Sequence, residues 1–341
     1  MKCISDLTKE ELTKELTGLG EQSFRGKQIF TWIHGKRAVS FEEMTDLSKA
    51  LRLKLFDRYL ICDPGITRIQ SSKIDGTKKF LLKLTDGSMI ESVFMRYRSW
   101  NSACISTQAG CAMGCRFCAS TIGGFIRNLS AGEMAGQIYV MEKETGERIS
   151  NVVLMGSGEP LLNLDEVQRF VSIISDSDGA GISKRNITIS TCGIVPQIRR
   201  LAAEHLPVNL AISLHAPNDE KRRHLMPIAE KYSLEELMDA VRYYYDETHR
   251  RLTFEYALVK GENDSKKDSD ELAGLLRGLN CVVNLIPVNP VRENDLKRPD
   301  NKSVEDFRKR LAMGGIEATV RRELGSDIDS ACGQLRARTL V

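Results

Sequence analysis

The sequence predicts an α/β protein built on a mostly parallel sheet, with a small helical domain in front of it. Apolar residues recur at helical spacing through residues 1–55, and two Asp-Gly turn signals interrupt alternating segments between 65 and 98. From residue 102 onward, strand-like and helix-like segments alternate. Such alternation is typical of parallel sheets that are doubly wound or curled into a partial barrel.

The first 55 residues are expected to form short helices. Leu12, Leu16 and Leu19 recur at roughly helical spacing, and the stretch 41–55 has a similar apolar pattern. Between them, residues 24–37 mix aromatic and basic side chains, a combination found in nucleic-acid contacts. A structural core with charged edges is the simpler explanation for so short a segment, so both interpretations stay open.

Residues 65–98 predict a small set of antiparallel hairpins. Asp75-Gly76 and Asp86-Gly87 are turn dipeptides of the kind that joins neighbouring antiparallel strands. Alternating or apolar runs flank both turns, at 66–69, 80–84 and 89–95. The predicted organisation is therefore a helical domain over 1–60, a hairpin segment over 61–98 and a sheet domain over 99–341.

The sheet domain is expected to gather its unusual residues at one edge. Strands are expected at 103–107, 151–156, 185–191, 208–214, 252–259, 282–288 and 317–322, and helices near 130–144, 165–176, 194–203, 233–247, 267–278 and 304–313. A cysteine-rich loop follows the first strand, Gly-Ser-Gly-Glu-Pro the second and Ser-Leu-His the fourth. Because parallel strands end at the same edge, these residues should meet at the carboxyl rim, where α/β folds assemble their sites.

The composition is typical of a globular protein. The 341 residues are 41% hydrophobic and 28% charged, and the formal net charge of +3 does not by itself imply a nucleic-acid partner. Residues 1–100 carry 18 lysines and arginines against 13 acidic residues, which suits a phosphate-bearing partner or an ordinary solvated surface equally. No apolar run reaches the length of a membrane span, and the polar start MKCISDLTKEELTKEL has no signal-peptide core.

The nine cysteines indicate metal binding or chemistry rather than a disulfide framework. The protein is expected to be cytoplasmic, where thiols stay reduced. Cys3, Cys62, Cys192 and Cys281 have no ligand spacing, so they are interpreted as small core residues.

Cys111, Cys115 and Cys118 give the strongest functional signal, because they are spaced C-x3-C-x2-C. Thiolates at short spacings of this kind hold iron–sulfur clusters. Three of them would leave one iron of a four-iron cluster open to a ligand that is not protein. A zinc site is the alternative, although zinc favours a fourth protein ligand and no further Cys or His lies close in the sequence.

Polar residues at the other strand ends suit the binding of such a ligand. Gly158 lets the backbone approach a bound ligand closely, and Glu159 offers a carboxylate that can hold the ligand's ammonium group. Ser190, the run Ser213–His215 and Asn289 add hydroxyls, an imidazole and an amide at the same rim. Taken singly, each is also a common turn residue, and the neighbouring cysteines favour ligand binding.

Three further residues are candidates for chemistry. Cys104 lies outside the cluster spacing, and Cys332 is flanked by small residues near the C-terminus. An accessible thiolate can be alkylated or form a disulfide, whereas a buried thiol is inert. Glu91 is a carboxylate in an otherwise apolar strand, which suits a solvent-facing position or, if it is buried, a general base.

Together these motifs resemble the RlmN family of RNA methyltransferases, part of the radical S-adenosylmethionine (SAM) superfamily. The resemblance covers nearly the whole chain and includes QSFRGKQIF, CISTQAGCAMGCRFCAS, NVVLMGSGEPLLN, NITISTCGIVP, NLAISLHAPNDEKRRHLMPI, VNLIPVNP and DIDSACGQLRA. It implies a partial (β/α)6 radical SAM barrel with a helical N-terminal accessory domain. It also implies methylation of adenosine carbon 2, in the peptidyl-transferase region of 23S rRNA and 3′ of the tRNA anticodon.

The resemblance also implies a role for each candidate residue. Cys111, Cys115 and Cys118 would ligate a 4Fe–4S cluster. The residues that would bind SAM are Gly158, Glu159, Ser190, Ser213, Leu214, His215 and Asn289. Cys332 would carry the methyl group as S-methylcysteine, Cys104 would release the product by forming a disulfide with Cys332, and Glu91 would accept the proton from the adenine. Each turnover would use two SAM molecules.

The implied partners are RNA and a reductase or flavodoxin-type electron donor, and the protein is expected to be a monomer. One departure from the family is Ser157, which stands where Met is usual between the glycines. Asp327 and Asp329 either position the loop of Cys332 or are solvated turn residues.

Two other hypotheses stay open. The first is a Cfr-type enzyme, which methylates carbon 8 of the same rRNA adenosine; such enzymes usually carry Ala where this chain has Pro160, so the residue favours RlmN. The second is a zinc-stabilised RNA-binding module, which would use the three cysteines without any radical chemistry.

Overall fold

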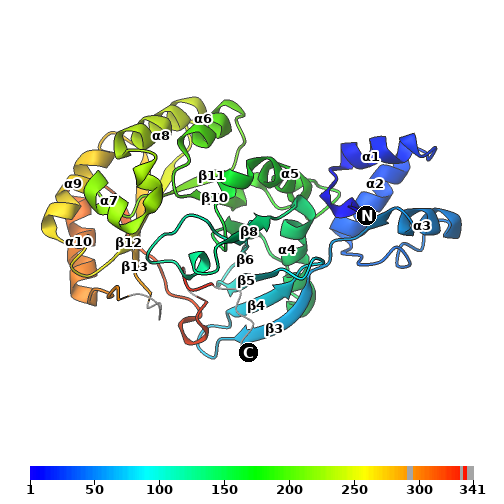
Figure 1. The fold of residues 1–341 in the computed structure, drawn as a ribbon, viewed down its shortest axis with the longest axis horizontal. Coiled ribbons are helices and arrows are strands. Elements are labelled where there is room, and N and C mark those ends of the chain that lie inside the picture. The colour runs from blue at the N-terminus through cyan, green and yellow to red at the C-terminus, as the bar shows by residue number, and fades with distance from the viewer. Residues whose placement is uncertain (290–294, 331–332, 336–341) are drawn as a thin grey trace.

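The computed structural model describes residues 1–289, 295–330 and 333–335 (Figure 1). Its largest sheet consists of β3 (Gly65–Ser71), β4 (Lys78–Lys83), β5 (Met89–Arg96), β6 (Asn101–Cys104), β9 (Asn151–Leu154), β10 (Ile187–Thr191), β11 (Asn209–Ser213), β12 (Leu252–Leu258), β13 (Cys281–Pro287) and β14 (Ala318–Val320). Their spatial order is β14-β13-β12-β11-β10-β9-β6-β5-β4-β3. Neighbours from β14 to β6 are parallel, and those from β6 to β3 are antiparallel.

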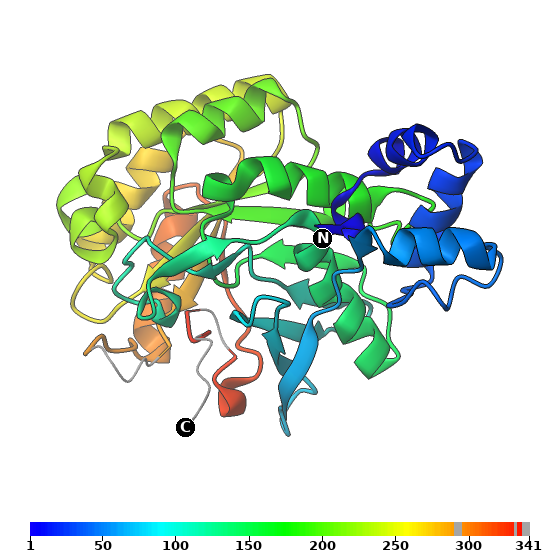
Figure 2. The same cartoon turned by 45° about the vertical axis from the view of Figure 1, so that its right-hand side comes forward.

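Helices lie outside the curved parallel part of this sheet, as the two views show (Figures 1 and 2). They are α4 (Ala131–Thr145), α5 (Leu164–Ser175), α6 (Val195–Ala203), α7 (Asp219–Leu225), α8 (Leu234–Thr248), α9 (Lys266–Leu276) and α10 (Asn301–Met313). Each parallel strand from β6 to β13 is followed by at least one of them. The predicted partial (β/α)6 barrel is therefore confirmed, and β14 adds one short strand at its edge.

The barrel strands and helices form where their side chains can be buried on facing surfaces. In α5, Val167, Phe170, Val171 and Ile174 are buried on one side of the helix. Helices α4, α8 and α9 each begin with a capping box, in which a serine and an acidic residue three positions later satisfy each other's backbone N–H groups. No helix in the described part of the chain has the length and apolarity needed to cross a bilayer.

Helix α7 was not predicted, and its sequence explains why. The segment DEKRRHL has no apolar periodicity, and only Arg222 and Leu225 are buried in it. It is held instead by its ends: the Asn218 side chain accepts a hydrogen bond from the Lys221 backbone N–H at the N-cap. A helix of this kind gives little signal to an analysis of hydrophobic spacing.

The antiparallel hairpins are observed where the turn signals predicted them. Gly76 and Gly87 have φ values of 74° and 87°, which the turns between β3, β4 and β5 require and which glycine adopts readily. The hairpins are not separate from the barrel, because β5 pairs with β6 and places Val93 opposite Cys104. The boundaries proposed at residues 60 and 98 stay a prediction.

The N-terminal residues form three helices beside the barrel, drawn in blue in Figures 1 and 2. These are α1 (Lys9–Gly18), α2 (Phe24–Phe30), which continues into a π-helical turn over Thr31–Gly35, and α3 (Lys49–Phe56). The helix expected over 41–55 begins only at Lys49, after Ser48 caps it by accepting from the Leu51 N–H. Two short parallel strands, β1 (Lys2–Cys3) and β2 (Tyr59–Leu60), close the domain and were not predicted.

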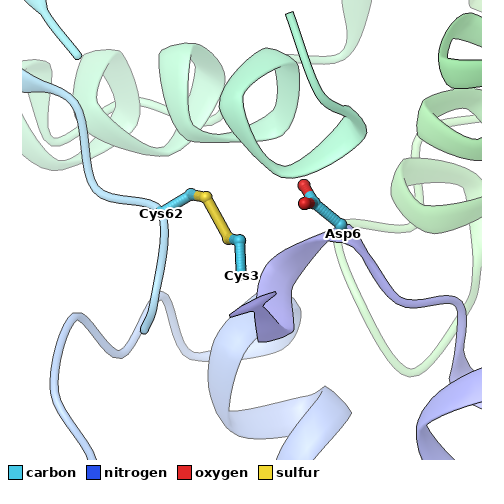
Figure 3. Close-up of side chains that lie close together, drawn as sticks. All are labelled: Cys3, Asp6 and Cys62. Carbon is cyan, nitrogen blue, oxygen red and sulfur yellow. A yellow bond between two sulfur atoms is a disulfide. The ribbon is translucent and has the colours of Figure 1, made fainter. Parts of the chain in front are cut away.

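The interpretation of Cys3 and Cys62 as small core residues is wrong. Both are half-buried, and their sulfur atoms form a disulfide (Figure 3). The parallel pairing of β1 with β2 brings them together, because Cys3 lies opposite Leu60, two residues before Cys62. The bond also departs from the expectation that the thiols of this chain stay reduced. Cys192 and Cys281 are buried, as expected for small core residues.

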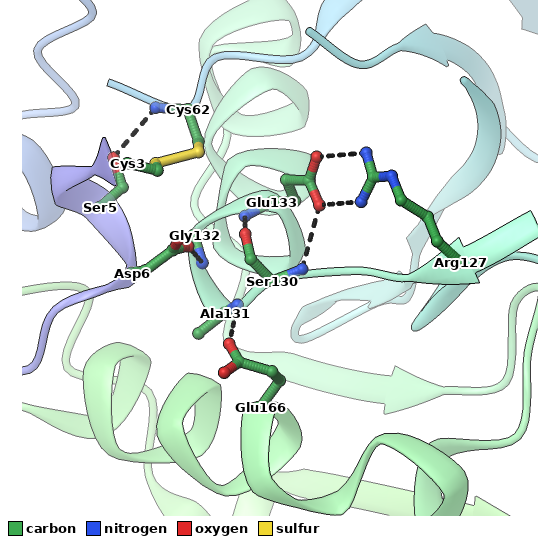
Figure 4. The surroundings of a disulfide bond; sticks show 10 residues. All are labelled: Cys3, Ser5, Asp6, Cys62, Arg127, Ser130, Ala131, Gly132, Glu133 and Glu166. Atoms are coloured by element: carbon green, nitrogen blue, oxygen red, sulfur yellow. Dashed lines mark hydrogen bonds and ion pairs between the residues drawn. A yellow bond between two sulfur atoms is a disulfide. The ribbon is translucent and has the colours of Figure 1, made fainter. Parts of the chain in front are cut away.

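The disulfide lies beside the first turn of α4, where the N-terminal domain meets the barrel (Figure 4). Asp6 accepts a hydrogen bond from the Gly132 N–H at 2.8 Å, and Glu166 accepts one from the Ala131 N–H at 2.9 Å. Ser130 caps the next position by accepting from the Glu133 N–H. Carboxylates from two other segments therefore satisfy helix N–H groups that would otherwise lack partners. Asp6 in this way attaches the N-terminal domain to α4, and Glu166 attaches α5 to it.

We expect Gly26→Ala to destabilise the N-terminal helices. A Cβ at position 26 of α2 would lie 2.5 Å from the Cα of Thr13 in α1, so the two helices would have to separate. Overpacking of this kind costs about 1–3 kcal/mol. Urea unfolding followed by Trp32 fluorescence, in a background carrying Trp100→Phe, measures the change in the free energy of unfolding.

The matched control is Gly18→Ala in α1, where no atom lies within 4 Å of the added Cβ. That substitution restricts the unfolded chain and is expected to stabilise the domain by about 0.4–1 kcal/mol. Equal effects of the two substitutions would contradict the close approach of α1 and α2.

Candidate active site

A cavity opens at the carboxyl rim of the parallel strands, with an empty volume of about 970 Å³, part of which is open to solvent. The predicted site residues that line it are Cys111, Cys115, Cys118, Gly158, Glu159, Ser190, Ser213, His215 and Asn289. Leu214 is fully buried and belongs to the core instead. The structure thus brings together residues from five separate loops and strand ends, whereas the roles assigned to them stay predictions.

The cysteine loop grows out of a small hairpin that the sequence analysis missed. Strands β7 (Gln108–Gly110) and β8 (Phe125–Asn128) pair in antiparallel fashion at its base. The Cys111 N–H donates to the Gly124 carbonyl at 2.9 Å, and the Cys118 N–H donates to the Cys115 carbonyl at 3.0 Å. These bonds hold all three cysteines in one short turn that faces the cavity.

The spacing of the three sulfur atoms does not suit a single zinc ion. Tetrahedral zinc with bonds of about 2.3 Å places its sulfur ligands about 3.8 Å apart. Among the described residues, the one group of three ligands whose atoms all lie within 4.8 Å of one another is Cys3, Asp6 and Cys62. At least one pair of the sulfur atoms of Cys111, Cys115 and Cys118 is therefore more than 4.8 Å apart, a separation that the corners of a multi-iron cluster allow.

Burial gives Cys111 and Cys115 unusual acid–base properties. Burial raises the pKa of the Cys111 thiol above its ordinary value. Burial is also the main cause of a much higher pKa for Cys115, and the neighbouring Cys118 and Cys111 raise it further because like charges repel. Cys111 and Cys115 are therefore protonated near neutral pH, and they would ionise only next to a positive group such as a metal.

The glycine-rich turn after β9 is built around Glu159. Its carboxylate accepts hydrogen bonds from the Cys192 N–H at 2.7 Å and the Leu161 N–H at 3.0 Å, and its own N–H donates to the side chain of Gln108. Gly158 has φ of 111°, and a Cβ there would lie 2.7 Å from the Cβ of Gln108. Burial raises the pKa of Glu159, although these bonds oppose the shift. The turn presents a buried carboxyl group to the cavity at a fixed position.

Ser157, the departure from the family pattern, does not line this cavity in the described residues. It is buried, and its hydroxyl donates to the Ser120 hydroxyl at 3.2 Å. Its backbone N–H donates to Ser106, and its carbonyl accepts from Thr107 and Gln108. The residue therefore joins the turn to the segment between β6 and β7.

His215 presents a neutral ring to the cavity. The Ala257 N–H donates to its Nδ1 at 2.8 Å, so the proton of the neutral ring lies on Nε2. Burial lowers the pKa of His215 to about 3, which keeps the ring uncharged near neutral pH. Phe117 packs edge-on against the ring with centroids 4.6 Å apart, and this contact links His215 to the cysteine loop.

Glu255 and Arg321 also line the cavity, and the sequence analysis missed both. The Glu255 carboxylate accepts a hydrogen bond from Asn284 at 2.9 Å and lies 3.7 Å from the Arg321 guanidinium. Burial raises the pKa of Glu255, whereas Arg321 opposes that shift. The sequence does contain a sign of Glu255, because it is the single charged residue of β12. Glu91 stands out in the same way as the single acidic residue of β5.

A second cavity, with an empty volume of about 650 Å³, adjoins the first. Cys104 lines it with Val93, Met95 and Tyr97, and three arginines do so as well: Arg298, Arg321 and Arg322. Both cavities are lined by Met155, Ile286, Asn289, Arg321 and Leu335, so they share a wall. Its lining mixes apolar and polar side chains, and Glu323 in it pairs with Arg298 at 3.1 Å. Apolar surface beside guanidinium groups suits a base attached to phosphates.

Cys332 lies outside the described residues, but residues on both sides of it are placed. Ser330 lines the second cavity. Gly333 lines the first, and its carbonyl accepts a hydrogen bond from the Ala119 N–H at 2.7 Å, next to Cys118.

Glu91 is buried and does not belong to the described lining of either cavity. Its carboxylate lies 3.4 Å from the ammonium group of Lys79, which donates to the Asp329 carbonyl at 3.1 Å. Asp327 accepts from the Lys73 N–H at 2.9 Å. Asp327 and the backbone of Asp329 therefore attach the loop that precedes Cys332 to the β3–β4 hairpin, which favours their interpretation as positioning residues.

Comparisons with known proteins agree with this arrangement. Residues 105–273 match the radical SAM superfamily, and residues 4–61 match the ribosomal RNA large subunit methyltransferase N-terminal domain. A protein of Alkaliphilus oremlandii named probable dual-specificity RNA methyltransferase RlmN is 56% identical, over 98% of this chain and 97% of its own. A protein of Clostridium novyi with the same name is 52% identical, over 98% of each chain. The crystal structure of a radical SAM methyltransferase from Sphaerobacter thermophilus has a TM-score of 0.95 at 44% identity, covering 99% of this chain and 100% of that one.

We expect cluster assembly on the apoprotein to become more favourable as the pH rises from about 7 to about 9. Because burial raises the pKa of Cys111 and Cys115, their thiols are protonated at neutral pH and must lose protons when they ligate a metal. Anaerobic titration of the apoprotein with ferrous iron and sulfide, followed by charge-transfer absorbance at several pH values, measures this dependence.

The number of protons released should fall by about one in Cys115→Ser. It should not change in Cys281→Ser, because Cys281 is a buried thiol at the start of β13 and does not line the cavity. An assembly constant that is independent of pH would show that the three cysteines are not the ligands.

Proposed function

The chain belongs to the RlmN family, and from this premise we propose that it is a radical SAM methyltransferase that methylates carbon 2 of adenosine in RNA. The proposed substrates are an adenosine in the peptidyl-transferase region of 23S rRNA and the adenosine 3′ of the tRNA anticodon. Membership in the radical SAM superfamily implies a 4Fe–4S cluster and SAM as cofactors. The use of two SAM molecules per turnover is part of the proposal.

The observation that carries this proposal is the wall shared by the two cavities. One cavity is lined by the three cysteines of the radical SAM motif, and the other is lined by Cys104 and three arginines. Met155 and Asn289 line both. A reactive group formed in the first cavity therefore has a short path to a base held in the second.

The chemistry of adenine explains why such an arrangement is needed. Carbon 2 is electron-poor, so it does not attack the methyl group of SAM as a nucleophile. When bound, the cluster and SAM supply both a methyl group and a carbon-centred radical, which removes the need for a nucleophilic carbon. The protein's part is to hold the base, to exclude water and to provide the thiols that carry and release the methyl carbon.

We assign the thiol steps to Cys332 and Cys104. Cys332 would take the methyl group on its sulfur, and that S-methyl group would lose one hydrogen atom to the carbon-centred radical. The resulting methylene carbon would bond to carbon 2 of the adenine, and the adduct would give up one electron, which the oxidised cluster could take back, and the proton of carbon 2. Cys104 would then attack the Cys332 sulfur, so that a disulfide forms, the bond from that sulfur to the transferred carbon breaks, and its electron pair together with a proton completes the methyl group. Three lining residues support this assignment. Cys104 and Ser330 line the second cavity, and Gly333, which follows Cys332 in the sequence, lines the first.

We assign the proton from the adenine carbon to Glu91. Residues two apart on a strand share a face, so Glu91 lies on the same face of β5 as Val93 and Met95, which line the second cavity. The Glu91 carboxylate is held 3.4 Å from the ammonium group of Lys79, which fixes its position on this strand.

The N-terminal domain is proposed to contact the RNA through residues 24–37. Phe24 is 57% exposed, and the Arg25 guanidinium lies 4.7 Å from the centre of its ring. Lys36 lies 3.6 Å above the ring of Trp32. Aromatic faces with attached cations suit unstacked bases and phosphates. We also propose, from the resemblance, a cytoplasmic monomer that receives electrons from a flavodoxin-type donor or a reductase.

Nucleoside mass spectrometry tests the product. RNA from a strain that lacks endogenous adenosine methylation at these positions should contain 2-methyladenosine when this chain is expressed. Appearance of 8-methyladenosine without 2-methyladenosine would identify a Cfr-type activity. Colourless protein with stoichiometric zinc and no methylated product would instead support the RNA-binding module.

The Cys104→Ala variant tests the thiol steps. It is expected to be isolated covalently attached to RNA, because the bond between Cys332 and the transferred carbon can no longer be broken. Denaturing electrophoresis before and after ribonuclease treatment detects the adduct. Cys332→Ala is the matched control and should form neither adduct nor product, and normal methylation by both variants would refute the two-cysteine mechanism.

A further inference from the structure

Arg222 is a fully buried cation that forms no ion pair with a carboxylate in the described part of the chain. Its side chain is 0% exposed, which is unusual for arginine. One of its nitrogen atoms, Nη2, donates to the Cys192 carbonyl at 2.7 Å. The other two, Nε and Nη1, are buried without a hydrogen-bond partner among the described residues, and none of the ion pairs in that part of the chain includes Arg222.

A buried charge of this kind is costly unless an opposite charge compensates it. The groups whose ionised forms would stabilise the charge of Arg222 are Cys192, Cys115 and Asp219, in that order. Burial raises the pKa of both thiols, so they are uncharged near neutral pH in the absence of a metal. Asp219 is engaged elsewhere, because it accepts the Leu234 N–H at 2.8 Å. Of the remaining two, Cys115 is the one that the proposed cofactor would convert to a thiolate.

The position of Arg222 is fixed by contacts with the cysteine loop and with β10. The Leu225 carbonyl of α7 accepts a hydrogen bond from the Arg116 N–H at 3.0 Å, between Cys115 and Cys118. Gly193 leaves room for the guanidinium, since a Cβ there would lie 3.2 Å from Nη2. Met226, whose N–H donates to the Arg222 carbonyl, lines the first cavity. The guanidinium is therefore packed behind the wall that holds the cysteines.

We propose that Arg222 is the countercharge of the iron–sulfur cluster, a positioning residue that acts through Cys115 and stabilises the reduced form of the cluster. This inference rests on the proposed function, which places a cluster on Cys111, Cys115 and Cys118. Three thiolates outweigh the positive charge of the iron–sulfur core, and reduction adds one more negative charge. A fixed cation in a low-dielectric wall favours the more negative state, so it raises the reduction potential.

A purely structural role predicts different behaviour. If Arg222 only fills space and bonds the Cys192 carbonyl, its replacement would weaken apoprotein and holoprotein alike and leave the potential unchanged. If it is a countercharge, the apoprotein contains an uncompensated buried cation, which is a cost in the absence of the cluster. Removing the charge should then leave the apoprotein as stable or more stable, and it should make the holoprotein less stable.

The test uses holoprotein reconstituted anaerobically and titrated with reductant while the electron paramagnetic resonance signal of the reduced cluster is followed. Arg222→Gln removes the charge but keeps an N–H that can donate to the Cys192 carbonyl. At a fixed ambient potential, its ratio of reduced to oxidised cluster should fall at least tenfold, which corresponds to 59 mV for one electron. Arg222→Lys keeps the charge and should stay within about threefold of the wild type.

Arg250→Met is the matched control. Arg250 also has a buried Nε without a partner among the described residues, but it precedes β12 at the opposite end of the barrel. Its replacement should leave the potential unchanged. In thermal unfolding, Arg222→Gln should melt at the same or a higher temperature than the wild type as apoprotein, and at a lower temperature as holoprotein.

The outcomes separate this inference from the proposed function. An unchanged potential in Arg222→Gln, or equal loss of stability in the apo and holo forms, would overturn the countercharge alone. If Arg222→Gln does not fold, Arg222→Lys decides the question. A tenfold fall in its ratio of reduced to oxidised cluster would also overturn the countercharge, because Lys retains the positive charge. Wild-type protein that takes up no cluster would overturn the proposed function and this inference with it.

Discussion

The parallel pairing of β6 and β9–β14 is the constraint on which the site depends. Backbone hydrogen bonds fix the register so that Ser213 lies beside Glu255 and Glu255 beside Asn284. Since side chains alternate between the two faces of a strand, a shift of one residue would turn these groups from the cavity into the helical layer. The same register ends every strand at one rim, where loops from separate parts of the chain can share a cavity.

The rim concentrates groups whose charge depends on partners that the fold supplies. Glu159 has two backbone N–H groups, Glu255 has Asn284 and Arg321, and His215 is kept neutral by burial. Arg222 differs, because it has no ion pair or carboxylate partner among the described residues, and in our proposal its charge is compensated by the cluster on Cys111, Cys115 and Cys118. A site that excludes water strengthens each of these interactions, and it also protects a carbon-centred radical from side reactions.

The N-terminal domain and the β3–β5 extension place further elements around this rim. Asp6 holds the first domain at the N-terminus of α4, and Lys79 and Lys73 hold the loop that leads to Cys332. Both attachments are made by residues far apart in the sequence. They connect the proposed RNA-binding surface and the proposed methyl carrier to the same barrel, so that base and thiol can approach the cavities together.

The sequence alone was sufficient for features that depend on neighbouring residues. The strand–helix alternation, the Asp-Gly hairpins and the spacing of Cys111, Cys115 and Cys118 are short-range patterns, and the structure shows the barrel, the hairpins and the common cavity that they predicted. Only the tertiary structure revealed that Cys3 meets Cys62, that Glu255 meets Arg321 and that Arg222 is buried within a charged segment. Pairing across the fold and the burial of a single charge depend on which distant segments pack together, and hydrophobic periodicity carries no information about either.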